Sequence, residues 1–229
     1  MTINGFQKMT LLDYPGKVAC TLFTGGCNFR CPFCHNAVLV TGGCSESYSE
    51  EEILSYLEKR KGILDGVCIT GGEPLLQKDI TDFIRKIKDL GYSVKLDTNG
   101  SFPDRLKSLV DEGLVDYVAM DIKNSVEKYP LTAGCDQKLI PFIEESIDFL
   151  LSGKVDYEFR TTVVKEFHNA DDISSLAKRI EGAEKYYLQF FEDSGGLLCE
   201  GLSAVDKDTM EAMRMKAEPF VKRAEVRGG

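Results

Sequence analysis

GGCNFRCPFCHN, residues 25–36, is the stretch that carries most of the information in this sequence. It places Cys27, Cys31 and Cys34 in the spacing C-x3-C-x2-C, which eight cysteines among 229 residues would give by chance only about 0.01 times. Three thiolates so close together on a glycine-containing loop can converge on one metal centre, and cysteine thiolates are the usual ligands of iron–sulfur clusters. The spacing therefore predicts a metal centre on this loop.

The number of ligands separates two kinds of metal centre. Iron–sulfur clusters usually have four thiolate ligands, so three cysteines leave one iron open to bind a substrate. The alternative is a zinc site of the Cys3His type that uses His35 or His168. Zinc sites commonly pair two C-x2-C units, and this sequence has no second unit. The loop favours an iron–sulfur cluster, with zinc as the alternative.

On both sides of the loop, short apolar runs alternate with amphipathic stretches. Strands are expected at 18–24, 66–70, 93–97, 115–122, 155–164 and 185–191, and helices at 49–61, 78–90, 103–111, 139–151 and 171–180. This alternation predicts parallel β-α-β units of the α/β class. Six units are too few to close an eight-stranded barrel, so we expect an open, partial (β/α)6 barrel with mostly parallel strands.

The chain reads as one domain over 1–229, with a core at about 16–192 and a helical tail at 206–222. The net charge of −9 argues against a nucleic-acid partner. No apolar run approaches the roughly 20 residues of a membrane helix, and the N-terminus does not resemble a signal peptide. We therefore expect a cytoplasmic protein that binds neither nucleic acid nor membrane.

Three further motifs follow predicted strands, at the edge where such barrels place their chemistry. GGEP, residues 71–74, combines glycines that let a ligand approach the backbone with a carboxylate that can accept hydrogen bonds from an ammonium group. DTNG at 97–100 and MDIK at 120–123 end the next two strands. They are expected to place Asp97 and Asp121 at one pocket.

The last two strands add polar side chains to the same pocket. Strand alternation puts Arg160 and Thr162 on one face and Thr161 on the other. An inward Arg is costly unless it is paired, so Arg160 is expected to contact a carboxylate or a ribose. Gln189 is expected to form part of the pocket wall.

With these motifs, the sequence resembles the radical S-adenosylmethionine superfamily. The segment CHN at 34–36 is similar to that of glycyl radical enzyme activating enzymes, and LLDYPGKV at 11–18 is similar to the activating proteins of anaerobic ribonucleoside-triphosphate reductases. The resemblance implies a [4Fe–4S] cluster on the three cysteines. It implies reductive cleavage of S-adenosylmethionine to a 5′-deoxyadenosyl radical, which forms a glycyl radical on a partner enzyme such as that reductase. Flavodoxin or ferredoxin is the expected electron donor.

The resemblance also implies roles for individual residues. The expected cofactor-binding residues are Phe33, Gly71, Gly72, Glu73, Pro74, Asp97, Thr98, Asn99, Asp121, Lys123, Arg160, Thr162 and Gln189. Within this set, the Phe33 backbone is expected to read adenine, and GGEP to hold the methionyl amino group. Asp13 and His35 are expected to contact the substrate.

The resemblance further suggests a monovalent cation at Asp97, Thr98 and Asp121, beside the cofactor carboxylate. The sequence departs from pyruvate formate-lyase activating enzyme near Glu192, where that enzyme has a His, so a cation site would be built differently here. His168, in a polar segment, is expected to be exposed.

Two other functions stay open at this point. One is a radical enzyme that acts on a small molecule, such as 7-carboxy-7-deazaguanine synthase. The other is a non-catalytic iron–sulfur or zinc scaffold, against which the missing fourth clustered cysteine and the GGEP segment both argue.

Overall fold

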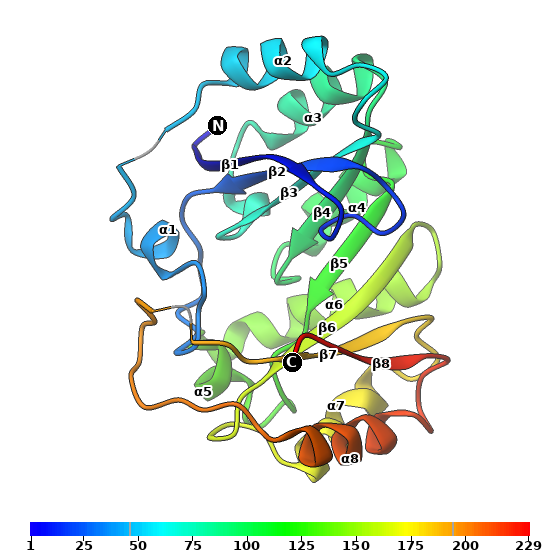
Figure 1. Ribbon diagram of the computed structural model, residues 1–229. Helices are drawn as coiled ribbons and strands as arrows, with labels where there is room; N and C mark the ends of the chain where they lie inside the picture. Colours follow the sequence, from blue (N-terminus) through cyan, green and yellow to red (C-terminus); the bar gives the residue numbers. More distant parts are fainter. Residues whose placement is uncertain (46, 194) are drawn as a thin grey trace.

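One sheet of eight strands, in strict chain order, forms the frame of the computed structural model, which describes residues 1–45, 47–193 and 195–229 (Figure 1). The strands are β1 (Ile3–Thr10), β2 (Ala19–Thr24), β3 (Gly66–Gly71), β4 (Ser93–Thr98), β5 (Tyr117–Asp121), β6 (Asp156–Val163), β7 (Tyr186–Phe190) and β8 (Ala224–Arg227). β1 is antiparallel to β2, and every later pair is parallel. Within the described chain β1 and β8 do not pair, so the barrel is open.

Helices connect the parallel strands, and most of them lie along the outer side of the curved sheet (Figure 1). They are α1 (Ala37–Thr41), α2 (Glu50–Lys59), α3 (Ile80–Asp89), α4 (Pro103–Asp111), α5 (Tyr129–Ala133), α6 (Ile140–Leu151), α7 (Ala170–Arg179) and α8 (Lys207–Ala217). Ser49 caps the start of α2 with a capping box closed by Glu52. The periodic apolar residues of α3 are fully buried against the sheet.

The predicted class, an open α/β barrel with mostly parallel strands, is confirmed, and the six predicted strands correspond to β2–β7. Two strands were not predicted. β1 lies at 3–10, ahead of the expected core. At the other end, the helix expected at 206–222 ends at Ala217, and the chain then returns to the sheet as β8. Among the described helices, none has both the length and the hydrophobicity needed to cross a bilayer.

A buried ion pair attaches β8 to the sheet. The Arg227 guanidinium donates two hydrogen bonds to the Glu158 carboxylate on β6, at 2.7 and 2.8 Å, and stacks 3.3 Å from the centre of the Tyr187 ring. Glu158 is 1% exposed and also accepts a hydrogen bond from the Tyr117 hydroxyl, at 2.9 Å. The pair therefore spans three neighbouring strands.

Arg227→Met is expected to destabilise the fold, because it leaves the Glu158 carboxylate buried without its positive partner. We expect the free energy of unfolding to fall by about 2 to 3 kcal/mol, below the full cost of a buried unpaired charge because Arg227 is partly exposed. Urea denaturation measures the change. Arg223→Met, which breaks the exposed pair with Glu225, is the matched control and should change little. Equal effects of the two changes would contradict the role given to Arg227.

Candidate functional site

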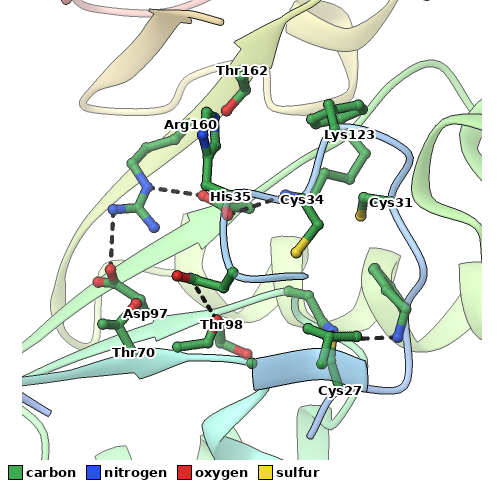
Figure 2. A pocket seen from close by; sticks show the side chains of 18 of the residues that line it. Cys27, Cys31, Cys34, His35, Thr70, Asp97, Thr98, Lys123, Arg160 and Thr162 are labelled. Carbon is green, nitrogen blue, oxygen red and sulfur yellow. Dashed lines mark hydrogen bonds and ion pairs between the residues drawn. The ribbon is translucent and has the colours of Figure 1, made fainter. Parts of the chain in front are cut away.

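A cavity of about 230 Å³ opens at the carboxyl ends of the parallel strands, where a barrel of this kind places its site (Figure 2). The residues that line it are Cys27, Phe29, Cys31, Phe33, Cys34, His35, Asn36, Val40, Thr70, Gly71, Gly72, Asp97, Thr98, Asn99, Asp121, Lys123, Arg160, Thr162 and Gln189. They come from the cysteine loop, from α1 and from the ends of β3–β7.

All three cysteines of the loop line this cavity. Burial raises the pKa of Cys27 to about 11 and that of Cys31 to about 12, so both are thiols until a metal displaces the proton. Among the described residues, no three His, Cys, Asp or Glu side chains are gathered around one metal position. An iron–sulfur cluster takes one thiolate per iron, and three thiols fit a cluster that keeps one iron open.

The two histidines considered for zinc have different surroundings. His35 lines the cavity with its ring 5.9 Å from that of Phe191, and burial, followed by the charge of Lys123, lowers its pKa. His168 lies outside the cavity, and the expectation that it is exposed is wrong: it is 5% exposed. Its Nδ1 accepts a hydrogen bond from the Val164 N–H at 3.1 Å, and its Nε2 donates to the Lys123 carbonyl at 2.7 Å. Neither nitrogen is left for a metal.

The two glycines of GGEP form part of the cavity wall. A Cβ on Gly72 would lie 1.9 Å from the Gly26 carbonyl oxygen, so only glycine fits where this turn meets the cysteine loop. The Asn36 side chain donates to the Gly71 carbonyl at 2.9 Å, which ties the other end of the loop to the same turn. These contacts hold the glycine backbone beside the three thiols.

Glu73 and Pro74 do not line the cavity. The Glu73 carboxylate is fully buried and accepts hydrogen bonds from the Thr98 hydroxyl at 2.9 Å, the Leu75 N–H at 3.0 Å and the Asn99 N–H at 2.7 Å. Burial raises its pKa to about 7, although all three donors lower it. In this structure Glu73 therefore joins two segments of the cavity wall from behind, and its oxygens do not face the cavity as expected from the sequence.

Glu73→Gln is expected to lower the free energy of unfolding by about 2 kcal/mol, because an amide NH₂ would replace one carboxylate oxygen among three donors. Chemical denaturation at pH 8, where Glu73 is ionised, measures this. The exposed Glu192 beside the cavity provides the control, Glu192→Gln, which should unfold like the unmodified protein. A Glu73→Gln variant of normal stability would argue against this account of the carboxylate.

Two aspartates meet three cationic side chains at the far wall of the cavity. Arg160 lies between them, with Nε 2.9 Å from Asp121 and Nη1 3.2 Å from Asp97 (Figure 2). Lys123 is 3.1 Å from the second Asp121 oxygen, and the buried Lys95 pairs with the second Asp97 oxygen. Burial alone would raise the pKa of Asp121, but Arg160 and Lys123 hold it at about 2. The group therefore has three positive and two negative charges at neutral pH.

This arrangement does not fit the monovalent cation expected at Asp97, Thr98 and Asp121. Each of the four carboxylate oxygens already faces a positive side chain, and the Thr98 hydroxyl donates to Glu73. The remaining charge of +1 favours an anionic group instead. As the sequence predicts, Arg160 points inward and is paired with carboxylates.

The cavity brings together all the sequence-predicted site residues except Glu73, Pro74 and Asp13. Asp13 lies in the connection between β1 and β2, at the opposite end of the parallel strands, where its carboxylate accepts a hydrogen bond from Thr21 at 2.5 Å. Its expected contact with the substrate is not supported by this position.

Several residues at the site were not predicted. Lys95 was overlooked, although it is two residues before Asp97 on the same face of the strand, which is the signal that could have revealed it. Phe29, Asn36, Val40 and Thr70 also line the cavity.

A protein-family model described as Radical SAM superfamily matches residues 21–171. The chain is 34% identical over 194 residues, 83% of its length and 80% of the relative's, to a Methanocaldococcus jannaschii protein named as a candidate glycyl-radical enzyme activating enzyme. It is 28% identical over 182 residues to 7-carboxy-7-deazaguanine synthase of Thermoplasma acidophilum, covering 74% and 82%. It is 27% identical over 240 residues to pyruvate formate-lyase 1-activating enzyme of Escherichia coli, covering 95% of each.

Proposed function

Because this chain belongs to the radical S-adenosylmethionine superfamily, we propose that it is a glycyl radical enzyme activating enzyme whose partner is an anaerobic ribonucleoside-triphosphate reductase. The observation that carries the proposal is the match to a pyruvate formate-lyase activating enzyme along 95% of both chains. The stretch at 11–18, similar to activating proteins of the reductase, supports the choice of partner.

The residues of the cavity fit the two groups that this function requires. Cys27, Cys31 and Cys34 would hold a [4Fe–4S] cluster through three irons. When bound, the cluster and S-adenosylmethionine supply the one-electron chemistry that yields a 5′-deoxyadenosyl radical. The net positive charge around Arg160 and Lys123 suits the cofactor carboxylate, and the cavity-lining backbone of Gly71 and Gly72 suits its amino group.

The open barrel and the surface around the cysteine loop suit a macromolecular substrate. Leu131 on α5 is 71% exposed, Val38 on α1 is 53% exposed, and Leu76 follows GGEP at 40%. All three lie on segments next to the cysteine loop, because α5 contacts Arg30, α1 follows the loop, and Leu76 approaches Gly26. We propose that these side chains contact the partner while its glycine-bearing segment enters the cavity.

An electron donor such as flavodoxin or ferredoxin completes the proposed system, and a reducing cytoplasm is its proposed location. The thiols that the proposed cluster requires as ligands are kept reduced in that compartment.

The test is anaerobic reconstitution with iron and sulfide, followed by reduction, addition of S-adenosylmethionine and assay of 5′-deoxyadenosine. Adding the co-expressed reductase should then give a glycyl radical, seen as an electron paramagnetic resonance signal. If cofactor cleavage occurs and the deazaguanine product forms while no reductase radical appears, the small-molecule function replaces this one. If no cluster forms, the scaffold function replaces both.

A further inference from the structure

The short helix α5 packs against the cysteine loop through its C-terminal end. The Ala133 carbonyl accepts a hydrogen bond from the Arg30 N–H at 3.1 Å and lies 3.4 Å from the Cys31 sulfur. Gly134 ends the helix at φ 58°, and a Cβ there would lie 2.2 Å from the Arg30 carbonyl oxygen. Cys31 is therefore held against the end of α5, and changes in this helix act directly on that ligand.

Tyr129, the first residue of α5, has a buried hydroxyl without a hydrogen-bond partner. The side chain is fully buried, with its ring edge-on to Phe29 at 6.5 Å and the Arg179 guanidinium 5.3 Å from the ring centre. Of the buried side-chain nitrogen and oxygen atoms in the described part of the chain, the Tyr129 hydroxyl is the one that lacks a partner. An unsatisfied buried donor is costly, so such a group calls for an explanation.

The hydroxyl is a donor that lacks an acceptor. A tyrosine is protonated at neutral pH, and burial raises the pKa of Tyr129 further, against the lowering effect of Arg179 and Lys123. The Lys123 N–H beside it can only donate, so it cannot accept the hydroxyl hydrogen. Phe29, whose ring meets the Tyr129 ring edge-on, lines the cavity together with Cys31, and the other end of α5 contacts the Cys31 sulfur. A thiolate and inorganic sulfides at Cys31 would supply the acceptors that the described residues lack.

We propose that the Tyr129 hydroxyl donates a hydrogen bond to a sulfur of the cluster at Cys31, either the thiolate or an adjacent sulfide, and so raises the reduction potential of the cluster. This inference rests on the proposed function, which places the cluster there. Hydrogen bonds to the sulfurs are among the factors that set cluster potentials. The reduced cluster has one more negative charge than the oxidised one, so a donor stabilises the reduced form more. Tyr129 is thus a positioning and tuning residue for the metal centre.

The test is Tyr129→Phe, which removes one buried oxygen and keeps the ring. In the metal-free protein the variant should unfold at a higher temperature than the unmodified chain, because it lacks the unsatisfied hydroxyl. In the cluster-loaded protein this gain should vanish or reverse. A redox titration followed by electron paramagnetic resonance should show the reduction equilibrium constant three- to tenfold lower, a decrease of about 30 to 60 mV for a one-electron couple.

Tyr186→Phe is the matched control, because Tyr186 is as buried as Tyr129 but its hydroxyl donates to Thr161 at 2.8 Å. It should lower the unfolding temperature equally with and without the cluster and leave the potential unchanged. If Tyr129→Phe also leaves the potential unchanged and shifts both unfolding temperatures equally, the inference fails while the proposed function stands. Iron and sulfide analysis of the unmodified protein distinguishes failure of this inference from failure of the proposed function. If the unmodified protein binds no cluster, both the inference and the proposed function are overturned.

Discussion

Cys31→Ala is expected to yield a protein that folds but cannot assemble its cluster, and that releases no 5′-deoxyadenosine above background from S-adenosylmethionine. The reason is the number of ligands: three thiols line the cavity, and the loss of one leaves two irons without a protein thiolate. Iron and sulfide content after reconstitution, with the absorbance of the cluster, measures assembly. The 5′-deoxyadenosine assay measures its consequence.

Cys199→Ala is the control for this change. Cys199 is exposed and outside the cavity lining, although its N–H donates to the Pro32 carbonyl in the cysteine loop at 3.0 Å. It should keep full cluster content and cofactor cleavage. An active Cys31→Ala variant with a complete cluster would show that the cluster is bound elsewhere.

Arg160→Gln is expected to weaken binding of S-adenosylmethionine by about 30-fold or more, since losing one partner of a buried charge pair costs at least about 2 kcal/mol. The change reduces the charge of the group formed by Lys95, Asp97, Asp121, Lys123 and Arg160 from +1 to neutral and removes the side chain that holds the two aspartates together. Equilibrium binding to the reconstituted protein measures the effect. Arg160→Lys keeps the charge but cannot reach both carboxylates at once, so it should bind with intermediate affinity.

Arg160→Gln should also change how the free energy of unfolding depends on pH in the acid range. Because its folded-state pKa is depressed to about 2, Asp121 contributes stability above its ordinary pKa of 3.8, and this is lost as the pH falls towards 2. Without Arg160 the folded-state pKa rises, so the loss still begins near pH 3.8 but is smaller and is complete at a higher pH. Acid unfolding of the two proteins compares them directly. Unchanged cofactor affinity together with an unchanged acid transition would contradict the role of Arg160.

Local patterns in the sequence were sufficient to predict the strands in the middle of the sheet. The strands β2–β7 are apolar runs bounded by turn residues, and their order along the chain fixes their order in the sheet. The cavity followed from the same rule, because residues at the ends of neighbouring parallel strands share one edge. The sequence alone thus groups Asp97, Asp121 and Arg160 at one pocket.

The sequence did not predict features whose position depends on contacts with distant parts of the chain. β8 has four residues and is stabilised by the distant Glu158, which no local pattern shows. His168 lies in a polar segment, yet its ring is buried by hydrogen bonds to two other segments. The Glu73 carboxylate looked available because its three donors lie in the surrounding backbone and in another strand end. Asp13 lies at the end of the parallel strands opposite the cavity because the turn that carries it leads into the amino end of β2.

The strict chain order of the strands has a consequence for how the protein is made. Gln189, on the last strand that lines the cavity, follows Cys34 by 155 residues. At a synthesis rate of about 5 to 20 residues per second, roughly 8 to 30 s pass between the two on the ribosome. During that time the three thiols are present without the walls that enclose them. We therefore expect the metal to be inserted after translation, into a finished barrel.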